Sequence, residues 1–310
     1  MMYAALNWCT ESHSALIDEL RDLCGGGIFQ MPARTPAMTA MTAATLDEMT
    51  GGRFRLGLGL SGPQVVEGWH GVPYGRPLTR TREYVEIVRR ILDRTDPLTF
   101  DGEEYQIPFR GQGASGLGKP LKRIGEARPD IPIYLASIGP QNVRLTAEIA
   151  DGWLPIFYSP ERAGEVFEAS LREGFDRSGT DAKSARFEVV PSVQAAAADD
   201  IDVARNQIRP QVALYVGGMG ARNRNFYFDL AVRYGFEREA IQIQDRYLEG
   251  DKLGAIAAVP DELVDEVALV GSKERIRDRL EVWRASRADA VAVGTVDLHT
   301  LRVVAEAAAM

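Results

Sequence analysis

The sequence predicts an α/β fold in which a parallel β-sheet is covered from outside by helices. The first observation is the order of the patterns: short apolar or β-branched runs alternate along the chain with amphipathic helical stretches, an order typical of parallel sheets. The second is length, because 310 residues are enough for an α/β barrel, which commonly occupies about 250 residues. The third is composition, with 45% hydrophobic and 26% charged residues, as is usual for a chain that buries a core.

Candidate strands are short apolar segments bounded by turn-forming residues. A weaker candidate is residues 1–7, and even with it an eight-stranded barrel would lack one strand. The six stronger candidates are residues 27–31, 54–60, 131–137, 153–158, 187–195 and 290–296.

The predicted helices lie between these strands. Thr35 and Pro36 have the properties of an N-cap and a first-turn proline, and the pair Gly51-Gly52 ends the helix that they begin. The other predicted helices are residues 12–23, the stripe formed by Tyr84, Ile87, Val88, Ile91 and Leu92, and the segments that begin at Pro140, Ser159 and Ser272.

Two segments interrupt the alternation. Residues 97–130 contain Asp101-Gly102 between apolar runs, which predicts a hairpin turn, followed by a glycine-rich stretch at 111–118. Residues 217–260 begin with a glycine-rich run and then read as mostly helical. Because the sequence shows no Pro/Ser linker and no short-period repeat, we expect residues 1–310 to form one domain with insertions near 97–130 and 217–260.

Composition excludes several classes of function. A net charge of −8 would repel a nucleic-acid backbone, and no apolar stretch approaches the roughly 20 residues that cross a bilayer. The two cysteines and three histidines have no metal-ligand spacing. We therefore expect a cytoplasmic protein that holds no metal and contacts neither nucleic acid nor a membrane.

Residues 57–62 match the G-x-G-x-x-G spacing of a dinucleotide-binding turn. That spacing requires a long helix immediately afterwards, whose N-terminus receives the pyrophosphate. Here Pro63 follows at once, and further glycines and prolines come between residues 68 and 77. We therefore interpret the segment as a barrel strand that leads into an open loop.

Residues 135–142 predict an anion site. A strand ends in small residues and Gly139, and Pro140 then fixes the first helical turn, so free backbone N–H groups would lie at the C-terminal end of the sheet. Helix starts of this form also occur in enzymes that bind no phosphate. The spacing alone therefore leaves phosphate binding open.

Several longer segments resemble the luciferase-like family of (β/α)8-barrel oxidoreductases, from about residue 26 to the C-terminus. The segments that carry the resemblance are residues 30–36, 47–59, 78–84, 100–102 and 147–153. Within the family, residues 61–69 and 155–160 are similar to the branch that uses the deazaflavin coenzyme F420.

The resemblance implies a TIM (β/α)8-type barrel that transfers a hydride between coenzyme F420 and a small organic substrate. It also implies three sets of cofactor-binding residues. A strand bulge with a non-proline cis peptide would back the cofactor ring, a loop would line the ring and its ribityl chain, and a helix start would hold the phosphate. In that order, these sets are Ile28, Phe29, Gln30 and Met31; Ser61, Gly62, Pro63 and Gln64; and Ala136, Ser137, Ile138, Gly139 and Pro140.

Structural interpretations of single residues stay open beside these roles. Gln30 could satisfy backbone groups of the barrel, and Ser61 could be a turn hydroxyl. Trp69 and Tyr158 are amphipathic and could pack at the rim of the barrel.

The N-terminal part departs from the family pattern. About 25 residues precede the matching segment, whereas family members have two βα units there and each unit needs about 30 residues. We therefore expect a barrel that lacks part of the first two βα units and either closes with fewer strands or stays open. The usual catalytic acid has no identifiable counterpart, so the catalytic residues stay unknown.

Two alternatives to the F420-dependent reaction remain. One is an FMN-dependent luciferase-like monooxygenase of the same fold, and the other is a truncated, non-catalytic barrel. Because family members often dimerise, we expect a homodimer. The sequence does not identify the substrate or the direction of hydride transfer.

Overall fold

The computed structural model describes residues 2–7, 24–125, 128–180, 183–295 and 297–309. The predicted helix at residues 12–23 lies outside the described residues, as do Cys9 and His13. The predicted strand at residues 1–7 is present as β1 (Met2–Asn7).

Parallel strands form the centre of the molecule, and all six stronger candidates contribute to them. The first sheet has the order β2-β3-β6-β7-β8, with every neighbouring pair parallel. Its strands are β2 (Cys24–Gln30), β3 (Phe54–Gly59), β6 (Ile133–Ala136), β7 (Gly152–Trp153) and β8 (Glu188–Val189).

The second sheet has the order β1-β11-β9-β10. In it β9 is parallel to both β10 and β11, whereas β1 is antiparallel to β11. Strand β10 was not predicted. The strands are β9 (Ser192–Ala197), β10 (Ala268–Gly271) and β11 (Ala290–Thr295), with β1 at the edge.

The two sheets are joined where β8 passes into β9. The Ser192 amide donates a hydrogen bond of 2.7 Å to the Pro155 carbonyl beyond β7, and the Ala292 amide donates one of 2.8 Å to the Pro191 carbonyl. The strands therefore follow one another as β2, β3, β6, β7, β8/β9, β11 and β1, and β10 also pairs with β9. Within the described residues, no backbone pairing joins β1 to β2.

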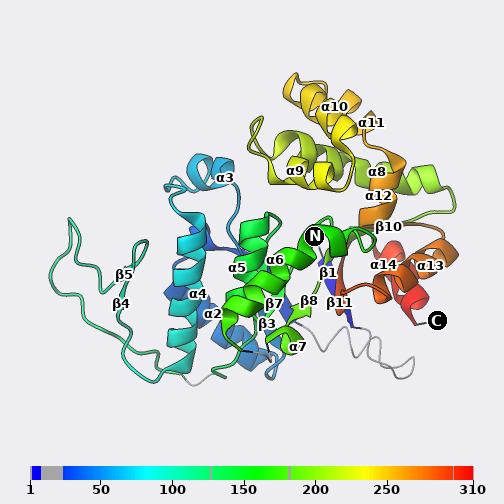
Figure 1. Ribbon diagram of the computed structural model, residues 1–310. Coiled ribbons are helices and arrows are strands. Elements are labelled where there is room, and N and C mark those ends of the chain that lie inside the picture. The colour runs from blue at the N-terminus through cyan, green and yellow to red at the C-terminus, as the bar shows by residue number, and fades with distance from the viewer. Residues whose placement is uncertain (1, 8–23, 126–127, 181–182, 296, 310) are drawn as a thin grey trace.

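Helices pack on the strands, as we predicted from the apolar stripes in the sequence. The predicted N-cap Thr35 accepts a hydrogen bond from the Met38 amide, and Ser272 accepts one from the Arg275 amide. The predicted start at Ser159 is a turn, and the helix itself begins four residues later. Helices α4, α5 and α6 lie side by side on the outside of the first sheet (Figure 1). The helices beside the strands are α2 (Pro36–Met49), α4 (Pro77–Asp93), α5 (Pro140–Ile149), α6 (Ala163–Ser178), α7 (Lys183–Arg186), α8 (Ile201–Ala213), α12 (Asp261–Val267), α13 (Lys273–Arg284) and α14 (Leu298–Ala308).

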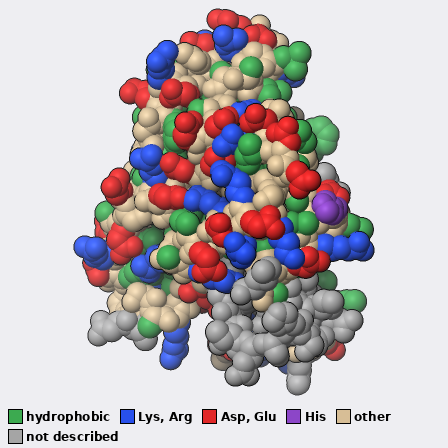
Figure 2. Space-filling model, turned by 90° about the vertical axis from the view of Figure 1, so that its right-hand side faces the viewer, with side chains coloured by type: hydrophobic (Ala, Val, Ile, Leu, Met, Phe, Trp, Pro, Cys, Tyr) green, Lys and Arg blue, Asp and Glu red, His purple; other side chains and the backbone are tan. Residues whose placement is uncertain are grey.

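Ion pairs connect the helices that pack on the second sheet. Acidic and basic side chains are interspersed on the face that Figure 2 shows. Arg205 of α8 pairs with Asp265 of α12 at 2.6 Å, and Asp265 also pairs with Arg275 of α13 at 2.8 Å. Among the described helices, none is both long and apolar enough to cross a membrane.

The first interruption of the barrel is the predicted hairpin. Strands β4 (Phe100–Asp101) and β5 (Gln106–Ile107) pair antiparallel, and the Gly102 amide donates to the Tyr105 carbonyl at 2.9 Å. The buried carboxylate of Glu83, on α4, accepts hydrogen bonds from the amides of Glu103, Glu104 and Tyr105 at 2.7, 3.0 and 3.0 Å. Glu83 thus connects the hairpin to the barrel, together with Arg80 of the same helix, which pairs with Glu104 at 2.7 Å.

The second interruption is helical, as predicted. It comprises the π-helix η2 (Leu214–Gly218), α9 (Phe226–Arg233), α10 (Glu237–Leu248) and α11 (Lys252–Ala257). These helices lie at the same end of the molecule as α3 (Pro63–Gly68), which directly follows the C-terminal end of β3 (Figure 1). The insertion therefore lies over the end of the barrel where α/β barrels hold their sites.

Replacing Glu83 by alanine should loosen the hairpin, because three backbone amides would lose their acceptor. We expect the free energy of unfolding to fall by about 1 to 3 kcal/mol, and limited proteolysis to become faster at residues 101–105. Glu86→Ala on the same helix is the control, since Glu86 forms only an exposed pair with Arg90 and should cost about 0.5 kcal/mol or less. Equal effects of the two substitutions in chemical denaturation would contradict this role.

Candidate functional site

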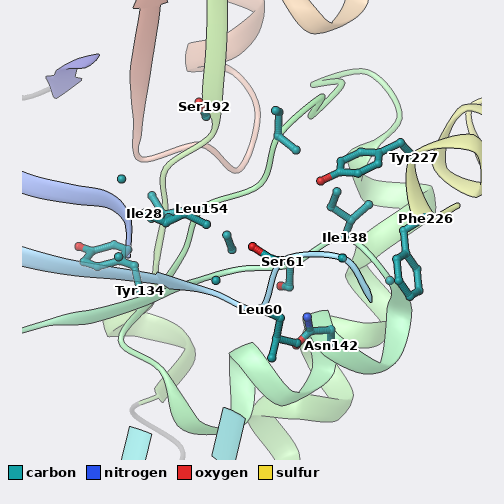
Figure 3. A pocket seen from close by; sticks show the side chains of 18 of the residues that line it. Ile28, Leu60, Ser61, Tyr134, Ile138, Asn142, Leu154, Ser192, Phe226 and Tyr227 are labelled. Carbon is teal, nitrogen blue, oxygen red and sulfur yellow. The ribbon is translucent and has the colours of Figure 1, made fainter. Parts of the chain in front are cut away.

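A cavity of about 2050 Å³ lies inside the strand array and extends to the insertion (Figure 3). Its walls come from the C-terminal ends of β2, β3 and β6, from the loop after β3, from the start of α5 and from α9. Of the thirteen predicted cofactor-binding residues, ten line it: Ile28, Gln30, Ser61, Gly62, Pro63, Ala136, Ser137, Ile138, Gly139 and Pro140.

The end of β2 carries the expected irregularity. The pairing of β2 with β3 shifts register between Gly26 and Phe29, and the non-proline cis peptide joins Gly27 to Ile28, at the edge of the expected segment. Ile28 and Gln30 line the cavity. Phe29 and Met31 instead face the core, where Met31 is buried and the Phe29 ring lies 6.5 Å from that of Phe54. The two-residue period of a strand explains why Phe29 turns away from the cavity, whereas Met31 begins the short helix η1 (Met31–Ala33) after β2.

The side chain of Gln30 is held by a histidine. Its Oε1 lies 2.9 Å from Nε2 of His70, which follows α3. The carbonyl end of the Gln30 amide is therefore engaged by a side chain and not by barrel backbone. Among the described residues, the side-chain amide nitrogen of Gln30 has no hydrogen-bond partner.

The loop after β3 is tightly turned. Ser61 has a left-handed backbone with φ of 60°, and its hydroxyl points into the cavity (Figure 3). The helix that follows, α3, has only six residues, which is shorter than the long helix that a dinucleotide-binding turn requires. Gln64 is exposed and does not line the cavity, and Trp69 is 83% exposed.

Glycines allow β2 and β3 to approach each other closely. A Cβ atom on Gly57 would lie 2.1 Å from the Gly26 carbonyl oxygen, and one on Gly59 would lie 2.1 Å from Cδ1 of Ile28. The Gly-x-Gly pair of β3 therefore serves strand packing beneath the cavity. This agrees with the strand interpretation of residues 57–62.

The start of α5 presents backbone amides at the wall of the cavity. Gly139 is its N-cap, and the Gly139 carbonyl accepts hydrogen bonds from the amides of Asn142 and Val143 at 3.0 and 2.9 Å. The amides of Ile138, Gly139 and Gln141 have no recorded partner among the described residues. A helix start with unpartnered N–H groups carries a partial positive charge and favours an anion.

Side chains fix this segment from behind. The Ser137 hydroxyl forms a hydrogen bond of 2.8 Å with the Thr146 hydroxyl, and the Ser137 carbonyl accepts a hydrogen bond of 2.9 Å from Trp153 Nε1. The Ile138 carbonyl accepts a hydrogen bond of 3.1 Å from Arg233 of α9. Burial lowers the pKa of the Arg233 guanidinium from its ordinary value. The side chain of Ser137 is thus structural, and what the segment offers a ligand is its backbone.

A polar cluster lines the cavity towards the N-terminal ends of the strands. Arg55 Nε donates a hydrogen bond of 2.9 Å to the Tyr134 hydroxyl, and that hydroxyl also bonds to Glu188. Tyr134 stays protonated, because burial raises the pKa of its hydroxyl. These side chains satisfy one another across β3, β6 and β8, so the cluster is self-contained.

Two residues that the sequence reasoning missed lie at the start of α9: Tyr227 lines the cavity, and Asn225 is buried behind the cavity wall. The buried side chain of Asn225 accepts hydrogen bonds from the amides of Tyr227 and Phe228 and donates to the carbonyls of Tyr215 and Val216. It therefore caps α9 and ties it to η2. Tyr227 directs its hydroxyl into the cavity (Figure 3). The available signal was an asparagine N-cap before an aromatic run. Among the described residues, no cluster of acidic, histidine or cysteine side chains could hold a metal ion.

Comparison with known proteins identifies relatives along most of the chain. The family model described as luciferase-like monooxygenase matches residues 24–290. A Mycobacterium tuberculosis protein named as a coenzyme F420-dependent oxidoreductase is 43% identical over 92% of this chain and 83% of its own length. The 5,10-methylenetetrahydromethanopterin reductase of Archaeoglobus fulgidus is 29% identical over 83% of this chain and 71% of its own.

A solved structure shares the fold. The coenzyme F420-dependent tetrahydromethanopterin reductase of Methanopyrus kandleri superposes with a TM-score of 0.69 at 24% identity, covering 93% of this chain and 80% of that one. At this identity the likeness bears on the fold alone, and it agrees with the predicted barrel.

Replacing Asn225 by alanine should release α9 from η2. The substitution removes a helix cap and two buried hydrogen bonds, so we expect the free energy of unfolding to fall by about 2 to 4 kcal/mol. Asn206→Ala, at an exposed position of α8, is the matched control and should stay within about 0.5 kcal/mol of the parent protein. Chemical denaturation measures the free energy of unfolding of both variants. If Asn225→Ala lowers it no more than Asn206→Ala does, Asn225 does not connect α9 to η2.

Proposed function

The chain belongs to the luciferase-like monooxygenase family, and from this premise we propose that it binds the deazaflavin coenzyme F420 and transfers a hydride between it and a small organic substrate. The name of the Mycobacterium tuberculosis relative, at 43% identity, supports the choice of cofactor. The proposal rests on one structural observation, the shared cavity of Gln30, the loop after β3 and the start of α5.

The residues around the cavity suit such a cofactor. The unpartnered amides at the start of α5 suit a phosphate, and Ile28 and Gln30 lie where a planar ring would rest against β2. Typical sites for small molecules have about 300 to 1,000 Å³, so a cavity of about 2050 Å³ has room for a cofactor and a substrate together. Within this proposal, the segment Ala136 to Pro140 forms the phosphate site, and the amides of Ile138, Gly139 and Gln141 donate the hydrogen bonds, since Pro140 has no N–H group.

The protein would contribute binding, orientation and exclusion of water. When bound, the deazaflavin supplies or accepts a hydride at a ring carbon, and this chemistry belongs to the cofactor. Leu60, Ile138 and Leu154 form an apolar lining that would keep water from the reacting atoms. His70 would orient the amide of Gln30 by holding its carbonyl end.

Three expectations of the sequence stay predictions. They are a single domain over residues 1–310 with insertions near 97–130 and 217–260, a homodimer, and a cytoplasmic location. Light scattering of the purified protein tests the second of these, since a monomer at working concentrations would contradict it.

Titration of the purified protein with coenzyme F420 and, separately, with FMN tests the proposed cofactor. We expect saturable binding of F420, seen as a change in its absorbance and fluorescence, and weaker binding of FMN, because the family branch that the site sequence resembles uses deazaflavin. Tight binding of FMN without binding of F420 would support the flavin-dependent monooxygenase instead. Binding of neither cofactor would leave the non-catalytic barrel as the better description.

A further inference from the structure

Tyr227 presents a hydroxyl group that the protein itself does not use. The hydroxyl points into the cavity from α9 (Figure 3), and no hydrogen-bond partner is recorded for it among the described residues. Tyr227 is half-buried, so this hydroxyl can meet a molecule that enters the cavity. The Tyr84 and Tyr234 hydroxyls, by contrast, bond to Thr39 and to the Phe157 carbonyl, at 2.6 and 2.9 Å.

The position of this hydroxyl is fixed by its surroundings. The Tyr227 ring stands perpendicular to the rings of Tyr215 and Phe157, with centroid distances of 4.7 and 6.1 Å. Asn225 accepts a hydrogen bond of 2.9 Å from the Tyr227 amide, so the backbone is held as well as the ring. Such a group is oriented before any ligand arrives, which lowers the entropic cost of using it.

The hydroxyl also keeps its proton at neutral pH. Burial raises the pKa of Tyr227 above its ordinary value, and the neighbouring Tyr215 adds to the rise. Tyr227 can therefore act as a hydrogen-bond donor throughout the physiological range. A donor of this kind suits an oxygen atom that carries or develops negative charge.

The cavity wall at α9 combines apolar and charged side chains. Ile138, Met219, Phe226 and Val232 give it apolar surface, and Arg224, Asp229, Arg233 and Glu237 also line the cavity. A ligand that rests on the apolar part of this wall is apolar along its body and polar at the point that meets the hydroxyl. Ketones and secondary alcohols with bulky apolar groups have this pattern.

We propose that Tyr227 hydrogen-bonds the oxygen of a carbonyl or alcohol substrate whose apolar body lies against this wall. The inference rests on the proposed function. In the reductive direction, the carbonyl carbon gains a hydride from the reduced deazaflavin, and the electrons of the C=O π bond move to the oxygen. That oxygen takes the proton of the Tyr227 hydroxyl, and the tyrosinate regains a proton from water. The oxidative direction reverses each transfer.

Binding of a matched pair of probes tests this role without turnover. Acetophenone and ethylbenzene have similar apolar bodies, and only acetophenone has a carbonyl oxygen. We expect the protein with oxidised F420 bound to prefer acetophenone, and we expect Tyr227→Phe to reduce that preference about fivefold, the value of one neutral hydrogen bond. The infrared carbonyl band of 13C-labelled acetophenone should lie at lower frequency in the parent protein than in Tyr227→Phe.

Tyr105→Phe is the control, because Tyr105 lies outside the cavity and its ring packs against Tyr84. It should leave both probe preference and carbonyl frequency unchanged. An unchanged preference or frequency in Tyr227→Phe would overturn the proposal, and so would a loss of F420 binding in that variant, since the hydroxyl would then serve the cofactor. If the parent protein binds no F420, the proposed function fails separately, and the probe preference measured without cofactor still decides the role of Tyr227.

Discussion

The start of a helix leaves backbone N–H groups that the helix cannot satisfy, and at α5 these groups line the main cavity. The site depends on this constraint. Pro140 begins the helix directly after Gly139, so the chain turns sharply at the end of β6. Trp153 of β7 donates a hydrogen bond to the Ser137 carbonyl, and Arg233 of α9 donates one to the Ile138 carbonyl. Three separate parts of the chain thus fix one short run of backbone.

The same cavity gains its other walls from close packing and from the insertion. Gly57 and Gly59 let β2 approach β3, which brings Ile28 and Gln30 to the cavity. Asn225 ties α9 to η2 and places Tyr227 on the opposite side. Within the proposed function, the barrel would position the cofactor while the insertion would meet the substrate. This division agrees with the general observation that loops on a rigid barrel carry specificity.

Local patterns were enough to predict much of this arrangement. The six strand positions were predicted because parallel strands are buried on both faces and read as apolar runs. Their bounds were less accurate: residues 187–195 form two strands, β8 and β9, and only Trp153 of residues 153–158 lies in a strand. The α5 start was predicted because a glycine followed by proline marks a helix N-terminus. Tyr227 was missed because nothing local shows which face of an inserted helix turns towards a cavity. Phe29 and Met31 were placed with Gln30 by resemblance, although strand alternation turns Phe29 into the core and Met31 is buried at the start of the short helix after β2.

The most direct test of the anion site is a change of one charge beside it. Gln141 is exposed in the first turn of α5, where an acidic residue favours helix stability but would repel a phosphate. We predict that Gln141→Glu weakens F420 binding about tenfold at low salt, and that it leaves unchanged the binding of a deazaflavin without the phosphate-bearing tail. Gln242→Glu on α10 should alter neither. Equal affinity of F420 for Gln141→Glu and the parent protein would contradict the account.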